Sequence, residues 1–268
     1  MKLGCLLYLP PPNVGFATVF FEHLQRYKRA TELILYSEHH WPGAIRLKAN
    51  PEAFRSVRTR EGAPSKFAIA NATFVAGLRI AWLNGFTHVL VLEPDVRVGR
   101  HYWDQEIFEE YFDLGFPCIA AGTLACFNMC NHSPLAAARW AELVKRNKRR
   151  NFPIASYGWL GGGVKGPSCV FPNGALAVYD LAWMHKLFGL DSVNYHEVAQ
   201  DTAWDQLIGL KIWDIFKEDS YLVVGHLQSI FSGYGEIVTT EQMRQELLTS
   251  GDCCAIHQVK SAWVPERQ

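Results

Sequence analysis

The sequence predicts a single α/β domain, in which helices cover both faces of a mainly parallel sheet. Short apolar runs that suit buried strands alternate with longer segments in which apolar residues recur at helical spacing. This alternation implies crossover connections, which place parallel strands in one sheet and helices on its two faces. The chain has 268 residues, 49% of them hydrophobic and 19% charged, which suits one large domain with a substantial core.

The first half of the chain contains most of the predicted elements. Strands are expected where branched and aliphatic residues cluster, at 3–9, 32–36, 88–92 and 117–125. Helices are expected at 14–27, 65–85 and 101–112. The long helix at 65–85 should stop at Asn84-Gly85, a strong helix-end signal. Irregular structure is expected over 38–64, which is rich in proline, glycine and polar residues.

The second half is expected to carry more irregular structure. We predict a helix at 135–150, a strand at 171–179, a helix from Asp180 and another opened by Asp201. The glycine-rich stretch 157–168 is interpreted as a surface loop, with a lid over a bound ligand as the alternative. It is not a P-loop, because its only lysine is followed by glycine rather than by serine or threonine.

One segment carries the clearest chemical signal. The buried run at 88–92 ends abruptly in Glu93-Pro94-Asp95, because a proline cannot continue a central strand. Two carboxylates are thus delivered at the carboxyl end of a strand, where open α/β sheets bind ligands. Buried carboxylates are costly to leave unpaired, so they favour a cation. A hard divalent metal that carries a phosphate is the natural candidate. The alternative is that the acidic residues cap the next helix or pair with Arg97.

Composition restricts the partners and the compartment. Lysine plus arginine equals aspartate plus glutamate, at 26 each, which argues against nucleic acid as a general partner. No stretch approaches the roughly 18 apolar residues of a membrane span, so no transmembrane segment is expected. The basic run at 145–150 suits the solvated end of a helix, with phosphate or peripheral membrane contact as the alternative. Seven cysteines form a poor disulfide framework and favour a cytoplasmic location.

Two further groups of residues are candidates for chemistry. Asp201 and Asp205 stand at a predicted helix start, where Asp201 could simply be the N-cap and Asp205 would project from the same side one turn later. A carboxylate in this place could also act as a general base. Near the C-terminus, His257 could complete a metal site if its strand returned beside Asp95, and Lys260 could then meet phosphate oxygens.

In this order, the motifs resemble those of GT-A-fold glycosyltransferases. SKFAIANATFVAGLRIAWLNGFTHVLVLEPDV is similar to the helix, strand and DxD segment of that family. FPNGALAVYD is similar to the segment that has a glycine near the acceptor, DTAWDQ to the acidic helix start below it, and IHQVKSAW to the terminal His and Lys segment of glycogenin-like members. The resemblance spans roughly residues 2–263.

The resemblance implies a fold, a cofactor and site residues. Mn²⁺ or Mg²⁺ would be bound by Asp95, by Glu93 directly or through water, and by His257. The nucleotide-sugar site would comprise Leu9, Pro10, Ser37, Lys66, Asn71, Glu93, Asp95, Gly174 and Lys260. Asp205 or Asp201 would face the acceptor hydroxyl as the catalytic base. Residues 1–125 would form the nucleotide-sugar half of the single domain, and 126–268 the acceptor half.

The sequence departs from the family pattern in two places. Glu93 stands where aspartate is most common, and the glycine often found between the terminal His and Lys is missing. The implied function is transfer of a sugar from a nucleotide-diphosphate sugar to a carbohydrate or other hydroxyl acceptor, with either inversion or retention. Two alternatives stay open, namely a catalytically silent sugar- or nucleotide-binding domain and a sugar-phosphate nucleotidyltransferase. The three consecutive prolines after the first strand argue against the latter.

Overall fold

The structure is a computed structural model that describes residues 1–10, 22–47, 57, 62, 65–94, 96–122, 124–126, 170–172, 176–216, 223–232, 249, 251 and 253–257. Its centre is a seven-stranded sheet in the order β10-β6-β9-β4-β1-β2-β3. These strands are β1 (Leu3–Tyr8), β2 (Glu32–Ser37), β3 (Ile45–Arg46), β4 (His88–Leu92), β6 (Ile119–Ala121), β9 (Leu176–Asp180) and β10 (Val224–His226). All pairs are parallel except those that β9 makes with β4 and β6. The predicted α/β class with a mainly parallel sheet is confirmed.

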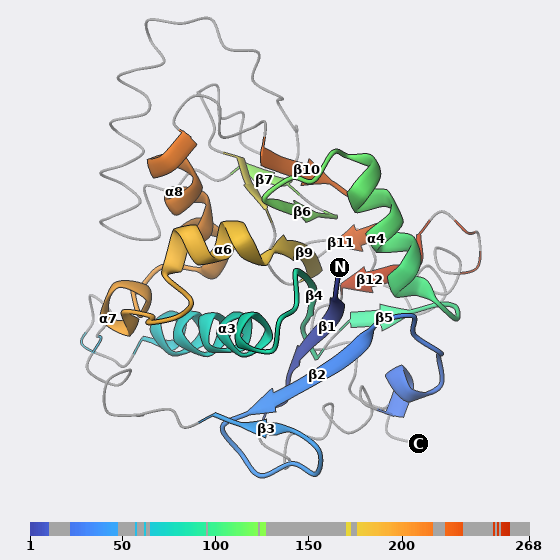
Figure 1. Ribbon diagram of the computed structural model, residues 1–268, viewed down its shortest axis with the longest axis horizontal. Coiled ribbons are helices and arrows are strands. Elements are labelled where there is room, and N and C mark those ends of the chain that lie inside the picture. Colours follow the sequence, from blue (N-terminus) through green and yellow to red (C-terminus); the bar gives the residue numbers. More distant parts are fainter. Residues whose placement is uncertain are drawn as a thin grey trace, which may run out of the picture.

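Helices cover both faces of this sheet (Figure 1). One face carries α3 (Lys66–Leu83), α6 (Leu181–Phe188) and α8 (Trp204–Phe216), with the short α7 (Tyr195–Val198) beside α3. The other face carries α4 (Trp103–Asp113) and a three-stranded sheet of β11 (Ile230–Ser232), β12 (Ala255–His257) and β5 (Val96–Val98). A two-stranded sheet pairs β7 (Leu124–Cys126) with β8 (Val170–Pro172).

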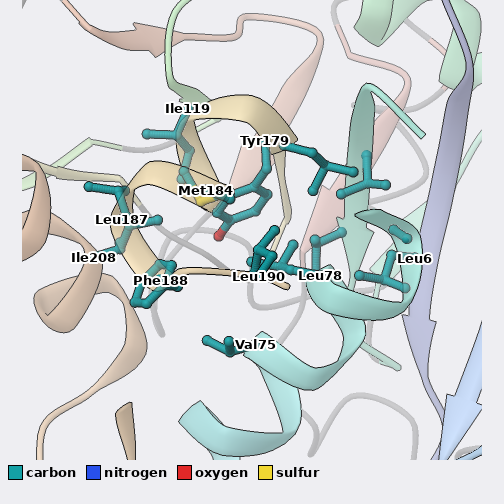
Figure 2. Packing of buried hydrophobic residues seen from close by; sticks show 14 of the residues in the cluster. Leu6, Val75, Leu78, Ile119, Tyr179, Met184, Leu187, Phe188, Leu190 and Ile208 are labelled. Atoms are coloured by element: carbon teal, nitrogen blue, oxygen red, sulfur yellow. The ribbon is translucent and has the colours of Figure 1, made fainter. Parts of the chain in front are cut away.

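Strand β4 is apolar from Val89 to Leu92 because it is buried on both faces. Val89 and Val91 point into the core beneath α3, α6 and α8, whereas Leu90 and Leu92 point into the core on the α4 side. This arrangement explains a continuous rather than an alternating hydrophobic run. Figure 2 shows the first of these cores, where Val75 and Leu78 of α3 meet side chains from the sheet and from α6 and α8.

Helix α3 has the ends that its sequence predicts. The Ser65 hydroxyl caps its first turn by accepting a hydrogen bond of 3.2 Å from the Ala68 N–H. The helix ends at Leu83 with Asn84 as its C-cap, and Gly85 follows with φ of 75°, a left-handed geometry that favours glycine. The expected helix from Asp180 is confirmed as well, because Asp180 accepts hydrogen bonds from Ala182 N and Trp183 N.

Several expected boundaries were wrong. The predicted strands at 117–125 and 171–179 are each two strands in different sheets, β6 with β7 and β8 with β9. The chain leaves the main sheet at Gly122, where a Cβ would lie 2.4 Å from Ile230 Cγ2. The short β3 was missed because two residues give no periodic signal.

Other expectations lie partly or wholly outside the described residues. Residues 22–25 of the helix predicted at 14–27 are helical. The helix predicted at 135–150 and the loop at 157–168 are not described. Within the described ranges, no helix has the length and hydrophobicity needed to cross a bilayer.

Candidate functional site

Three parallel strands deliver their carboxyl ends to one edge of the main sheet. Leu7 of β1 pairs with Leu35 of β2 on one side and with Leu92 of β4 on the other. The residues that follow these strands in the chain therefore emerge side by side. They include Glu93 after β4, and this edge is where parallel α/β sheets bind ligands.

The predicted residues after β1 and β2 are joined by hydrogen bonds. The buried Ser37 hydroxyl donates to the Leu9 carbonyl at 2.6 Å and accepts from the His39 N–H at 3.0 Å. The Pro10 carbonyl accepts from Trp41 Nε1 at 2.8 Å. The structure thus brings Leu9, Pro10 and Ser37 together. The two hydrogen bonds of the Ser37 hydroxyl link the backbone after β1 to the backbone after β2 at this edge.

A buried tyrosine lies within the electrostatic reach of two of the predicted carboxylates. Burial holds the pKa of Tyr179 well above its usual value, against the hydrogen bond that Trp204 donates to the phenol oxygen, and the charges of Asp205 and Glu93 add to the rise. Burial also raises the pKa of Tyr36, with smaller contributions from Tyr8 and Glu93. The charges of Glu93 at the end of β4 and of Asp205 in the first turn of α8 thus both act on Tyr179.

The structure separates the environments of Asp201 and Asp205. Helix α8 begins at Trp204, so Asp201 lies three residues before it, and its carboxylate accepts a hydrogen bond of 2.5 Å from the Ser65 hydroxyl. The expectation that Asp201 caps this helix is wrong, because the cap position directly precedes the first helical residue. Asp205 itself is buried, with 7% of its surface exposed.

Two predicted residues of α3 lie near this segment. Asn71 is fully buried, and its Nδ2 donates to the carbonyls of Gln200 at 3.3 Å and Thr202 at 2.8 Å. Its Oδ1 has no hydrogen-bond partner among the described residues. Lys66 is the first residue of α3, and its side chain is outside the described part of the structure.

Strand β12, near the C-terminus, pairs with β5, which begins directly after the acidic motif. Strand β12 pairs antiparallel with β5, and in this register the backbone of His257 lies opposite Val96, the residue that follows Asp95. The Val96 N–H also donates to the Glu93 carbonyl at 3.2 Å. The side chain of His257, and all of Asp95, Gly174 and Lys260, lie outside what the structure describes.

The predicted ligands, two carboxylates and an imidazole, are residue types that bind divalent cations. Among the described residues no group of three His, Cys, Asp or Glu side chains is close enough to hold a metal. Of the predicted ligand side chains, that of Glu93 is described, and the backbone of His257 pairs with Val96, three residues after Glu93. Carboxylate oxygens are the ligands that Mg²⁺ prefers, and Mn²⁺ accepts them together with imidazole.

Sequence reasoning missed two polar residues at this site. Glu38 directly follows β2, and its carboxylate accepts a hydrogen bond of 3.1 Å from the Thr73 hydroxyl of α3. Burial raises the pKa of Tyr8 to about 12, and the nearby charge of Glu38 contributes. The rule that singled out Glu93, an acidic residue directly after a buried strand, would have found Glu38 too. Tyr179 has no such signal, because it stands within an apolar strand.

The structure is similar to several glycosyltransferases at low sequence identity. The apo form of mouse xyloside xylosyltransferase 1 is 11% identical, with a TM-score of 0.47 over 98% of this chain and 99% of that chain. Core-mannan synthase A from Aspergillus fumigatus, in a Mn/GDP form, is 10% identical, with a TM-score of 0.46 over 79% and 69%. The galactosyltransferase LgtC, in complex with donor and acceptor sugar analogs, is 16% identical, with a TM-score of 0.44 over 98% and 88%.

No protein-family model matches the sequence, and no curated protein matches it either.

Proposed function

We propose that this chain is a metal-dependent glycosyltransferase of the GT-A type, which moves a sugar from a nucleotide-diphosphate sugar to a hydroxyl acceptor. The observation that carries the proposal is the pairing of β12 with β5, which places the backbone of His257 opposite Val96. The two paired strands stand next to two segments that are about 160 residues apart in the sequence and that were both interpreted as metal-binding.

The metal would be held by Asp95, Glu93 and His257. Mn²⁺ or Mg²⁺ bound there would act as a Lewis acid that stabilises the negative charge of the departing diphosphate. Lys66, at the start of α3, and Lys260 would supply further positive charge. The amide groups at the beginning of a long helix also favour an anion, and α3 has no acidic residue in its first turn.

The nucleoside would lie on the loop that follows β1. The hydrogen bond between Ser37 and Leu9 orders the backbone that it would meet, and the Trp41 indole fixes Pro10. In this arrangement residues 1–125 provide the nucleotide side of the site. The second half provides the acceptor side through Gly174 and the segment that begins α8.

The acceptor hydroxyl would be deprotonated by a carboxylate if the reaction inverts the anomeric centre. We assign this role to Asp205, and what supports it is its position in the first turn of α8 and the effect of its charge, like that of Glu93, on the pKa of Tyr179. With retention, the same carboxylate would orient the acceptor instead.

The first experiment is a thermal melt of the protein with UDP-, GDP-, CMP- and dTDP-sugars, each in Mn²⁺ and in EDTA. A ligand that binds only the folded state raises the melting temperature by mass action, so the proposal expects a metal-dependent shift with one nucleotide family. The binding donor is then tested for transfer and for hydrolysis. Binding with neither reaction would identify a silent domain, and formation of a nucleoside triphosphate from the sugar nucleotide and pyrophosphate would identify a nucleotidyltransferase.

Variants of the acidic motif test the metal site. Asp95→Asn and Glu93→Gln should abolish the metal-dependent part of the shift and of turnover. Glu109→Gln is the matched control, because Glu109 is an exposed carboxylate whose hydrogen bond is to Gln105 of the same helix. Normal turnover by Asp95→Asn, or no shift with any donor, would contradict the proposal.

A further inference from the structure

Five residues join the start of α3 to the segment that precedes α8, and we call them the α3 clamp: Ser65, Asn71, Gln200, Asp201 and Thr202. Three hydrogen bonds link the two sides, from Ser65 to Asp201 at 2.5 Å and from Asn71 to the carbonyls of Gln200 at 3.3 Å and Thr202 at 2.8 Å. These contacts bridge about 130 positions of the sequence. Ser65 and Asn71 are fully buried, and Thr202 is nearly so.

The orientation of the Asn71 side chain follows from its partners. Both partners are backbone carbonyls, which can only accept hydrogen bonds, so the amide nitrogen must face them. An amide nitrogen has two protons, and the two carbonyls use both. Aspartate has nearly the same shape but would direct a carboxylate at two carbonyl oxygens, which reverses the interaction from attractive to repulsive.

The Ser65 hydroxyl has two tasks at once. It accepts the hydrogen bond of the Ala68 N–H as the cap of α3, and it donates its single proton to the Asp201 carboxylate. One carboxylate oxygen of Asp201 is therefore occupied, and the side chain is tied to α3. A general base needs a carboxylate that can turn toward the acceptor hydroxyl.

The clamp fixes the entry into α8. Two residues after Thr202, the Trp204 ring packs on Phe74 of α3 with 4.0 Å between ring centroids, and its indole N–H donates to the Tyr179 hydroxyl at 3.0 Å. Asp205 is the next residue. Its position relative to the sheet is thus set by contacts with α3 on one side and with β9 on the other.

We propose that Ser65, Asn71 and Asp201 are positioning residues that hold the 200–202 segment on α3, and that Asp205 alone is the acceptor-side carboxylate. The role of Asp205 rests on the proposed function, whereas the clamp itself does not. For Asn71 this inference adds a positioning task that the sequence did not suggest. It also resolves the choice between Asp201 and Asp205 that the sequence left open.

Hydrogen exchange tests the clamp independently of catalysis. The full chain is compared with Asn71→Asp, Asp201→Ala and Asp201→Asn, and amide exchange is followed by mass spectrometry in peptides that cover residues 199–208. Asparagine keeps an oxygen that can accept from Ser65, so Asp201→Asn should preserve protection. Asn71→Asp and Asp201→Ala should raise exchange by about tenfold or more, because buried hydrogen bonds are lost. Asn84→Asp, the same chemical change at the exposed end of α3, is the matched control.

Kinetics with the donor found above then separate the two carboxylates. Asp205→Asn should lower kcat by about 10²- to 10⁴-fold, the range for loss of a general base. Asp201→Asn should retain at least about ten times the kcat of Asp205→Asn. Asn71→Asp should lower kcat by about 100-fold with a small change in the KM of the donor, as expected when a catalytic group is misplaced.

Exchange decides whether the clamp exists, and the kinetics decide which carboxylate faces the acceptor. Unchanged exchange in Asn71→Asp would overturn the clamp, whatever the activity. Protection in Asp201→Asn together with a loss of kcat as large as in Asp205→Asn would make Asp201 catalytic and overturn the assignment. If the wild type transfers no sugar, the proposed function fails and the assignment of Asp205 with it, while the exchange data still decide the clamp.

Discussion

Gly77 of α3 packs directly against the ring of Tyr36 in β2. A Cβ at Gly77 would lie 2.4 Å from Tyr36 Cζ and 2.7 Å from its hydroxyl oxygen. Tyr36 is almost completely buried, and its ring lies 5.6 Å from that of Tyr8. The close approach explains a glycine in the middle of an 18-residue helix, a place where glycine is otherwise unfavourable.

Replacement of Gly77 by alanine should destabilise the protein. Alanine improves helix propensity by roughly 1 kcal/mol, but overpacking of a fixed aromatic ring typically costs about 1–3 kcal/mol and can cost more. We expect a net loss of about 1–2 kcal/mol in the free energy of unfolding, measured by urea denaturation. In a Tyr36→Leu background the penalty should be smaller, because the ring is gone. An alanine variant at least as stable as the wild type would contradict this packing.

Removal of the Asp104 carboxylate should have a large effect on stability. Asp104 is fully buried in α4 and accepts hydrogen bonds from the Thr31 N–H at 2.8 Å, the Thr31 hydroxyl at 2.7 Å and the Ala30 N–H at 3.0 Å. Asp104→Ala leaves these donors without a partner, so we expect a loss of about 2–4 kcal/mol in chemical denaturation. Glu109→Ala on the exposed side of the same helix should change stability by less than about 0.5 kcal/mol. Equal effects of the two variants would disprove this role.

The protein should become less stable as the pH is lowered, and His88 should cause part of this loss. Burial lowers the pKa of His88 below its ordinary value of about 6.5, although Asp180 at 3.8 Å opposes the shift. Below pH 6.5 the unfolded chain therefore binds a proton that the folded chain does not, which favours unfolding as the pH falls. Unfolding free energies measured between pH 5 and 7.5 should depend less on pH in His88→Gln than in the wild type. The exposed His196→Gln should keep the wild-type slope, and equal slopes in all three proteins would refute the prediction.

The buried thiols should be inert in the folded protein. Burial raises the pKa values of Cys5 and Cys254 to about 12, and both side chains are completely buried. The thiolate is the reactive species, so at pH 8 we expect neither residue to react with iodoacetamide within an hour. The same treatment in guanidinium chloride should label both, as read by peptide mass spectrometry. Labelling of Cys5 at equal rates in the two conditions would show that it is accessible.

Local sequence determined the elements that build the core and one end of the site. The continuous apolar run at 88–92 specified a strand buried on two faces, and Glu93 with Pro94 marked where it stops. Periodicity and end signals likewise placed α3 and α4 to within two residues. These features were predictable because strand and helix periods, caps and breakers act over a few neighbouring residues.

Tertiary structure decided which distant segments meet. No local signal distinguishes β9 as the antiparallel strand between β4 and β6, and none splits the apolar run at 117–125 at Gly122. Asp201 has the sequence of a helix cap, yet its hydroxyl partner is Ser65, 136 positions earlier. Short motifs specify what a residue can do. The partner that it finds depends on how the whole chain packs, because hydrogen bonds and strand registers are chosen among surfaces that exist only after folding.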